Sequence, residues 1–192
     1  MALINKSDAL AFARRSVNFS RTASMILNEH VEKQARTSEF DIFLSHAFDD
    51  KELILGVTML IENLGYQVYL DWRDDPQLDR KSVTVKTADV LRKRMRECKC
   101  LFFATTPNYE KSQWMPWELG YKDGHSSRTA ILPIVDQPSS SYTGKEYLGL
   151  YPYVDSANDT DGKAKLWINI DTRRYVGLDS WLKGNEPAEH SK

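Results

Sequence analysis

Few cysteines and no long hydrophobic run set the first limits on this sequence. Its 192 residues include two cysteines, Cys98 and Cys100, whose spacing fits neither a Cys-x-x-Cys metal pair nor a disulfide framework. We expect both to be reduced thiols in or near a core strand of a cytoplasmic protein. No apolar run approaches the roughly 20 residues that span a bilayer, and residues 1–6 lack the apolar core of a secretory signal. The sequence therefore predicts no membrane association.

An excess of charge of either sign is missing as well. The 26 Lys and Arg residues nearly balance the 27 Asp and Glu residues, for a net charge of −1, so nothing attracts the whole surface to nucleic acid. Phosphate-loop, dinucleotide-fingerprint, His-Glu-x-x-His and Gly-x-Ser-x-Gly motifs are absent, and the four histidines are scattered. We therefore expect no nucleic-acid partner, no metal and no cofactor. Kinase, oxidoreductase and metalloprotease activities are disfavoured.

Residues 1–37 carry no strand pattern and predict a helical extension. One stripe recurs at alternating four- and three-residue steps, as on one side of an amphipathic helix. It consists of Phe12, Ser16, Phe19, Ala23 and Ile26. Such a helix either packs on the outside of the domain or binds a partner, and both interpretations stay open here.

Strands and helices alternate from residue 40 onward. Short apolar runs predict strands at 40–44, 66–70, 101–105 and 131–135, with a last one at 166–169. Helical periodicity predicts helices near 53–64, 88–98, 114–121 and 175–182. Asp49 and Glu52 resemble a capping box, and Gly65 ends that helix. Segments 71–82 and 137–162 are polar and predict loops.

This order predicts right-handed crossovers and one α/β domain, with a central, mainly parallel sheet of about five strands between helical layers. We place the domain at 38–183 and expect residues 184–192 to form a disordered tail. In such sheets ligands bind outside the carboxyl ends of the strands. Those ends are Ser45-His46-Ala47, Asp71-Trp72, Thr105-Thr106-Pro107 and Asp136.

A phosphoacceptor domain would also place acidic residues at these ends. Asp49 and Asp50 follow the first strand and Asp71 ends the second. Such a domain needs its acceptor on the third strand and a lysine after the last one, where this chain has Thr105 and Asp136. The residues therefore disfavour this interpretation.

Five segments, in order, resemble one family. They are Phe40–Ala47, Leu64–Asp71, Cys98–Phe103, Ser112–Leu119 and Ile131–Ile134. They are similar to the opening strand, the second strand, the central strand, the Trp-x-x-x-Glu motif and the following strand of TIR (Toll/interleukin-1 receptor) domains. The resemblance is to stand-alone bacterial TIR proteins, such as those that produce the signal in Thoeris anti-phage systems. It implies a flavodoxin-like three-layer sandwich.

The resemblance also implies hydrolysis or cyclisation of NAD, with Glu118 as the catalytic residue. The bond to nicotinamide already carries a cationic leaving group, which departs neutral, so the paired carboxylates of O-glycosidases are unnecessary. One carboxylate suffices to stabilise the oxocarbenium-like ribose. Glu118 follows Trp114 by four residues, so both lie on one helix face.

Seven further residues are candidates for contacts to NAD. Ser45, His46 and Ala47 offer hydrogen bonds to phosphate or ribose. Asp71 and Trp72 border the nicotinamide end or merely cap the loop, and Trp114 and Trp117 wall off the site or belong to the core.

The family resemblance further implies self-association through the segment from Asp71 to Ser82, called the BB loop. Its mixed charge, with Arg73, Asp75, Arg80 and Lys81, suits a head-to-tail contact. The product, which is ADP-ribose or a cyclic or conjugated derivative, would be sensed by a separate effector protein.

Two other functions compete with this one. A non-catalytic scaffold that binds other TIR domains is possible in this fold, but scaffolds generally lack the glutamate, so Glu118 favours an enzyme. A nucleoside deoxyribosyltransferase is also an α/β protein with a catalytic glutamate, and the five segments disfavour it.

Overall fold

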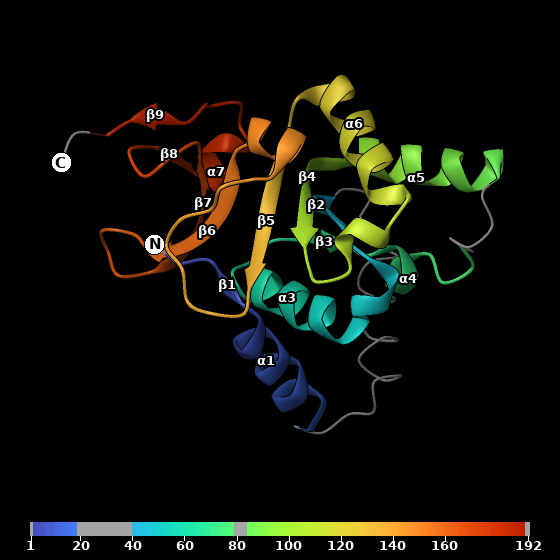
Figure 1. Cartoon of the computed structure of the whole chain (residues 1–192), viewed down its shortest axis with the longest axis horizontal. Helices are drawn as coiled ribbons and strands as arrows, with labels where there is room; N and C mark the ends of the chain where they lie inside the picture. The colour runs from blue at the N-terminus through green and yellow to red at the C-terminus, as the bar shows by residue number, and fades with distance from the viewer. Residues whose placement is uncertain (1, 19–39, 79–83, 191–192) are drawn as a thin grey trace.

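The computed structural model describes residues 2–18, 40–78 and 84–190, which form a mixed sheet between two helical layers (Figure 1). The strands are β1 (Ile4–Asn5), β2 (Phe40–Ser45), β3 (Val68–Tyr69), β4 (Cys98–Thr105), β5 (Thr129–Val135), β6 (Tyr153–Asn158), β7 (Ala164–Asn169), β8 (Arg174–Gly177) and β9 (Ala188–Glu189). The helices are α1 (Lys6–Asn18), α3 (Lys51–Asn63), α4 (Asp71–Asp74), α5 (Val85–Glu97), α6 (Trp114–Ser126) and α7 (Leu178–Trp181). Three 3-10 turns complete the list: η1 (Phe48–Asp50), η2 (Tyr109–Lys111) and η3 (Glu146–Leu150).

The centre of the sheet is parallel, as predicted. Its strand order is β3-β2-β4-β5-β6, and each neighbouring pair runs parallel. These strands are apolar runs because both of their faces are covered. One face packs on α1, α3 and α7, and the other packs on α5 and α6. The α/β fold with a mainly parallel central sheet is therefore confirmed.

The sheet is longer than predicted, because β7, β8 and β9 extend it with antiparallel pairs. The predicted loop 137–162 contains η3 and β6, and the predicted helix 175–182 is a strand followed by one helical turn. The tail from 184 was expected to be disordered, but β9 pairs with β8 there. In β6, Asp, Ser and Asn are poor strand formers, and pairing with β7 overrides their propensity.

The predicted capping box is wrong. Asp49 lies in η1, and α3 begins at Lys51 after Asp50, which makes no side-chain cap. Asp50 Oδ1 instead accepts a hydrogen bond of 2.7 Å from the Asn108 amide, which ties this turn to the loop after β4. Gly65 does end the helix, in the left-handed conformation with φ of 97°.

The N-terminal segment is part of the sheet, contrary to the expectation that residues 1–37 hold no strand. β1 pairs in parallel with the end of β5, and Lys6 forms an ion pair of 3.2 Å with Asp136 just beyond it. Then α1 packs on α3 through Ala9 and Ala13, which are buried. Phe12 of the predicted stripe is only partly buried, and the stripe beyond it lies outside the residues whose side chains are described. The packing favours the first of the two interpretations for this helix.

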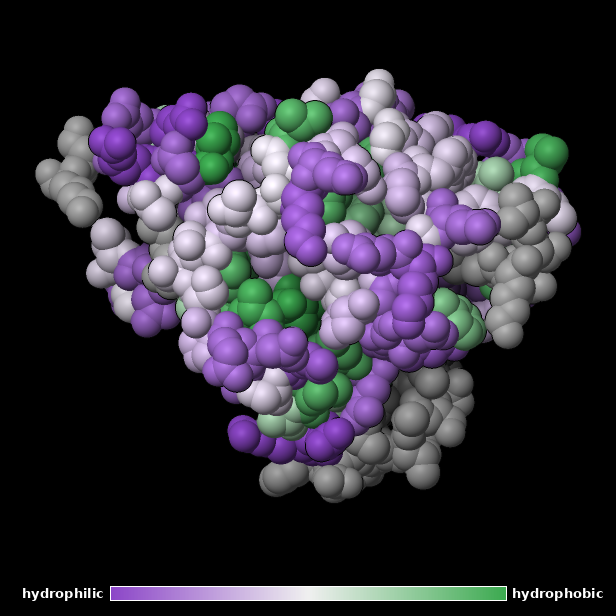
Figure 2. All heavy atoms as spheres, viewed as in Figure 1, coloured by the Kyte–Doolittle hydropathy of each residue, from purple (hydrophilic) through white to green (hydrophobic). Residues whose placement is uncertain are grey.

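Apolar surface on the face seen in Figure 2 gathers around β1, the end of β5 and the junction of α1 with α3, while hydrophilic residues cover most of the rest. Both cysteines are free and buried in β4, as predicted. Among the helices of the described residues, none is long and apolar enough to cross a membrane.

Gly56 is required for the contact between α1 and α3, and we expect Gly56→Ala to destabilise the protein by about 1–3 kcal/mol. An added Cβ would lie 2.0 Å from the carbonyl oxygen of Ala9, so one helix has to move. Thermal unfolding measures the loss. Gly124→Ala on α6 is the control, because a Cβ there meets nothing within 4 Å and alanine favours a helix. Equal melting temperatures for the two variants would contradict the close contact.

Asp155 on β6 introduces a pH dependence into the stability of the sheet. Its side chain is fully buried, and burial raises the pKa of Asp155 to about 6. Asn169 lies nearby but donates to the carbonyl oxygens of Tyr153 and Trp167. A carboxyl whose pKa is higher in the folded than in the unfolded state stabilises the fold fully below the unfolded value, and this stability is lost as the pH rises through about 6.

We therefore expect Asp155→Asn to remove this dependence. Between pH 4 and pH 7 the wild-type protein should lose about 2 kcal/mol of unfolding free energy relative to the variant. Urea unfolding at a series of pH values measures the difference. Asp161→Asn, in the exposed turn after β6, should keep the wild-type profile. Parallel profiles for wild type and Asp155→Asn would show that this carboxyl does not titrate as described.

Candidate active site

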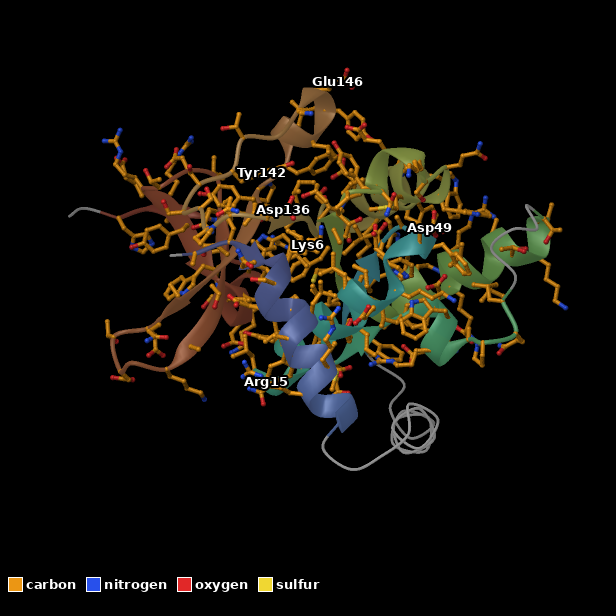
Figure 3. All side chains as sticks on the ribbon, turned by 60° about the horizontal axis from the view of Figure 1, so that its bottom comes forward. Lys6, Arg15, Asp49, Asp136, Tyr142 and Glu146 are labelled. Carbon is orange, nitrogen blue, oxygen red and sulfur yellow. The ribbon has the colours of Figure 1, made fainter. Side chains whose placement is uncertain are left out.

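The carboxyl ends of the parallel strands share one edge of the sheet, which Figure 3 turns toward the viewer. In that view Asp49, after β2, lies on one side of the edge. Tyr142 and Glu146, from the connection between β5 and β6, lie apart from it, and Lys6 and Asp136 lie near Tyr142. The site predicted from the sequence therefore lies among loops that follow β2, β3, β4 and β5.

Glu118 is the centre of this edge. It lies on α6, has no exposed surface, and its Oε2 accepts a hydrogen bond of 2.6 Å from the Ser45 hydroxyl at the end of β2. A carboxylate shielded from water interacts more strongly with a nearby cation than an exposed one does. The same burial means that a substrate reaches Glu118 only after a local opening of the site.

His46, Asp71 and Trp72 are brought together beside Ser45, as predicted. The Trp72 indole donates to His46 Nε2 over 3.0 Å, while His46 Nδ1 lies 2.9 Å from the carbonyl oxygen of Leu44. An indole N–H only donates, so Nε2 is the acceptor and the proton is on Nδ1. His46 is therefore neutral in this arrangement, and its 3.6 Å approach to Asp71 is not a full ion pair. Ala47 is buried in the same turn.

Trp114 and Trp117 belong to a row of aromatic side chains along α6. The two indoles meet edge to face at 5.4 Å, and Trp117 stacks on Tyr121 at 5.9 Å. Arg92 of α5 lies 5.4 Å above the Trp117 ring. Trp117 thus faces α5, on a different side of the helix from the buried Glu118. Contacts of either indole with NAD stay predictions.

Comparison with known proteins agrees with this architecture. Residues 42–167 match the family model described as TIR domain. The chain belongs to the TIR domain family. It is 42% identical over 193 residues to "Probable 3' cyclic ADP-D-ribose synthase ThsB'" of Bacillus cereus, an alignment that covers 96% of this chain and 100% of the relative. It is also 34% identical over 83 residues to "Putative cyclic ADP-D-ribose synthase TIR2" of Cytobacillus dafuensis, covering 43% of this chain and 22% of that protein. The resemblance found in the sequence is confirmed.

The BB loop of this TIR domain differs from the exposed, mixed-charge segment that the sequence suggested. Its first residues form α4, and Arg73 is buried, donating to Glu62 at 2.8 Å and to Asp74 at 3.0 Å. Asp75 is also buried and accepts from Arg94 at 2.6 Å and from Tyr69 at 2.7 Å.

Because Arg73 and Asp75 are paired inside the chain, the prediction that they contribute to a mixed surface charge is wrong. Burial alone would raise the pKa of Asp75, but the hydrogen bonds from Arg94 and Tyr69 hold it below its ordinary value. The charges of Arg73 and Asp75 are therefore satisfied inside the chain. Arg80 and Lys81 lie outside the described residues, and self-association through this loop stays a prediction.

Lys122 was missed by the sequence analysis, although it follows Glu118 by one helical turn. It is almost fully buried, and its ammonium donates to the carbonyl oxygens of Met95 at 2.9 Å and Cys98 at 2.6 Å. Burial lowers the pKa of Lys122. These bonds satisfy carbonyl groups at the end of α5, where a cation is favourable. Lys122 thereby anchors the helix that carries Glu118.

A pocket of about 410 Å³ was also missed, because part of its wall is η3, in a segment that was predicted to be a loop. It lies between β4, η2, the first turn of α6 and η3. One of its lining residues borders the Glu118 site, because Phe103 pairs with Ser45 across β4 and β2.

The hydrogen bond between Ser45 and Glu118 should be measurable as a coupling energy. We expect Ser45→Ala to cost about 1.5–3 kcal/mol, because it removes a donor from a buried charged acceptor. In the Glu118→Gln background the same substitution should cost about half as much, since the acceptor is then neutral. Urea unfolding of the four proteins closes this double-mutant cycle.

Ser126→Ala on the same helix is the control for loss of a hydroxyl, since the Ser126 hydroxyl donates to the Lys122 carbonyl over a long 3.4 Å. Its effect should stay within about 0.5 kcal/mol. Additive effects of Ser45→Ala and Glu118→Gln would contradict the bond.

Proposed function

We propose that this TIR protein cleaves the bond between nicotinamide and ribose in NAD and forms a cyclic ADP-ribose, with ADP-ribose as the product of competing hydrolysis. The observation that carries the proposal is the buried Glu118 carboxylate, held by Ser45 at the carboxyl edge of the sheet. Support also comes from the two relatives, whose names describe cyclic ADP-ribose synthases.

The geometry around Glu118 suits a reaction that needs charge stabilisation and no proton donor. When the C–N bond breaks, its electron pair leaves with nicotinamide, which becomes neutral, and the ribose becomes a cation. A carboxylate shielded from water stabilises that cation where it forms. Capture by a hydroxyl of the same molecule closes a ring, whereas capture by water gives ADP-ribose.

The neighbouring residues position the substrate. The Ser45 hydroxyl offers a hydrogen-bonding group to the ribose, and His46, Asp71 and Trp72, which contact one another, form the adjoining wall. In this proposal NAD is the substrate, and the chain needs no metal or further cofactor. The setting is the cytoplasm, where a cyclic nucleotide signal would be sensed by a separate effector protein in anti-phage defence of the Thoeris type.

Self-association through the BB loop belongs to the same proposal but involves Arg80 and Lys81 more than Arg73 and Asp75, whose charges are paired internally. The competing function, a non-catalytic scaffold, does not account for Glu118. A carboxylate without solvent contact in the protein interior is costly, and a scaffold has no use for one at this edge.

We expect Glu118→Gln to lower nicotinamide release from NAD by about 10²–10³-fold, because it removes the preorganised negative charge. The amide keeps the shape of the side chain and still accepts from Ser45, so the melting temperature should stay equal or rise. Chromatography of nicotinamide over time measures the rate.

Glu189→Gln is the matched control, since Glu189 is exposed on β9, and it should turn over NAD like the wild type. Wild-type rates in Glu118→Gln would remove Glu118 from catalysis. A wild-type protein that releases no nicotinamide, even with lysate of infected cells, would favour the scaffold.

A further inference from the structure

The pocket beside Glu118 has the walls of a nucleobase site. Three aromatic side chains line it, Phe103, Tyr109 and Tyr147. Phe103 and Tyr109 hold each other edge to face at 5.9 Å, whereas Tyr147 is 42% exposed at the opening. A volume of about 410 Å³ lies within the range of small-molecule sites. Aromatic side chains bind the flat face of a base by stacking.

The net charge of the lining residues favours a base over a phosphate as the group bound in this pocket. Glu110 and Glu146 face only one cation, Lys145, so the lining carries one excess negative charge. A diphosphate is repelled by such a lining, but the exocyclic amine of a base donates well to a carboxylate. Glu110 is exposed beside the aromatic wall and accepts from the Tyr109 hydroxyl at 3.1 Å. Glu146 lies at the outer side of η3 (Figure 3).

The backbone around η3 adopts a restricted conformation that fixes this wall of the pocket. Glu146 has φ of 49°, in the left-handed region that residues other than glycine rarely adopt. At Gly144 an added Cβ would lie 2.5 Å from the backbone nitrogen of Gly149, so the segment closes tightly on itself. Backbone strain of this kind persists where the surrounding structure enforces it, and it is concentrated at binding sites.

We propose that this pocket binds the adenine ring of NAD and thereby decides between ring closure and hydrolysis. The inference rests on the proposed cleavage at Glu118 and adds to it the position of the other end of the same molecule. Phe103 connects the pocket to the Ser45–Glu118 pair, because it pairs with Ser45 across β4 and β2. An adenine held here places the adenosine ribose beside the cation that forms at Glu118.

The chemistry balances without a further reactant. The C–N bond to nicotinamide breaks and its electron pair departs with neutral nicotinamide. An adenosine-ribose hydroxyl oxygen then forms a C–O bond to the cationic ribose carbon and gives its proton to water. If the adenine leaves the pocket, water takes the place of that hydroxyl and linear ADP-ribose results. Total nicotinamide release therefore measures cleavage of the C–N bond, whereas the ratio of cyclic to linear product measures whether the hydroxyl or water captures the cation.

The test compares Tyr147→Ala with wild type on NAD and on nicotinamide mononucleotide, which has no adenosine. Loss of one stacking wall should raise KM for NAD about tenfold and lower the ratio of cyclic to linear product by a similar factor. The difference between the two proteins should vanish with nicotinamide mononucleotide. Tyr147→Phe should retain the wild-type KM and product ratio, because it keeps the ring.

Leu150→Ala is the matched control, since Leu150 is 82% exposed in the same segment and does not line the pocket. It should behave like the wild type with both substrates. An unchanged KM and product ratio in Tyr147→Ala would overturn the proposal. An equal loss on both substrates would also overturn it, because the pocket would then hold the nicotinamide end.

A binding measurement tests the adenine pocket independently of NAD cleavage. Adenosine added to Glu118→Gln protein should shift the ring resonances of Tyr109 and Tyr147 in NMR spectra, and Tyr147→Ala should weaken that binding about tenfold. Shifts without any turnover in the wild type would support the pocket and refute the proposed function. Turnover with no shift of either tyrosine would refute the pocket alone.

Discussion

The hydrogen bond from Ser45 to Glu118 joins the end of β2 to α6, the helix that carries the proposed catalytic residue. Ser45 is placed by the sheet, because β2 lies between β3 and β4 and is fixed on both sides by parallel pairing. Glu118 is placed by α6, whose buried apolar side chains, Met115 and Leu119, pack into the core. Burying a carboxylate is costly unless a donor reaches it, so the Ser45 hydroxyl makes this position of Glu118 tolerable. The bond requires the helix and the strand to keep one relative position.

Lys122 shows how that position is maintained at the other end of the helix. Its ammonium is held by two carbonyl groups at the junction of α5 and β4, one turn beyond Glu118. Two buried charged side chains of opposite sign thus lie on one face of α6, and each is satisfied by a different partner rather than by the other. Any rotation of the helix that freed Glu118 would also strain the contacts of Lys122. Opening of the site therefore has to come from the loops over the edge, such as α4 and η3, more than from α6.

Much of the fold was predictable because its central strands are buried on both faces and read as continuous apolar runs. Topology and the segments that resemble the family led to Ser45, His46, Trp72 and Glu118, and the structure brings Ser45 to Glu118 and His46 to Trp72, while their roles stay predictions. What the sequence did not show depends on contacts between distant residues. β6 has the composition of a loop and is a strand only because β7 pairs with it. Arg73 and Asp75 look like surface charges until Glu62 and Arg94 are seen to meet them. The pocket needs η3 to fold back beside β4, which no local pattern reports.

Regular elements carry Glu118, whereas irregular segments form the neighbouring pocket, and this difference affects how related proteins can vary. Cleavage of the glycosidic bond needs one shielded carboxylate, and the elements that supply it are regular strands and a helix. The fate of the resulting cation depends on which nucleophile is held nearby, and in the proposed adenine pocket that choice falls to η2 and η3, which are irregular and tolerate change in sequence. On this proposal, a TIR protein keeps the bond between Ser45 and Glu118 unchanged while substitutions in residues 109–112 and 145–148 alter the product. Since a signal is useful only if its effector distinguishes it from related molecules, selection on the product would act on these two short segments, while selection on cleavage would act on the sheet edge and α6.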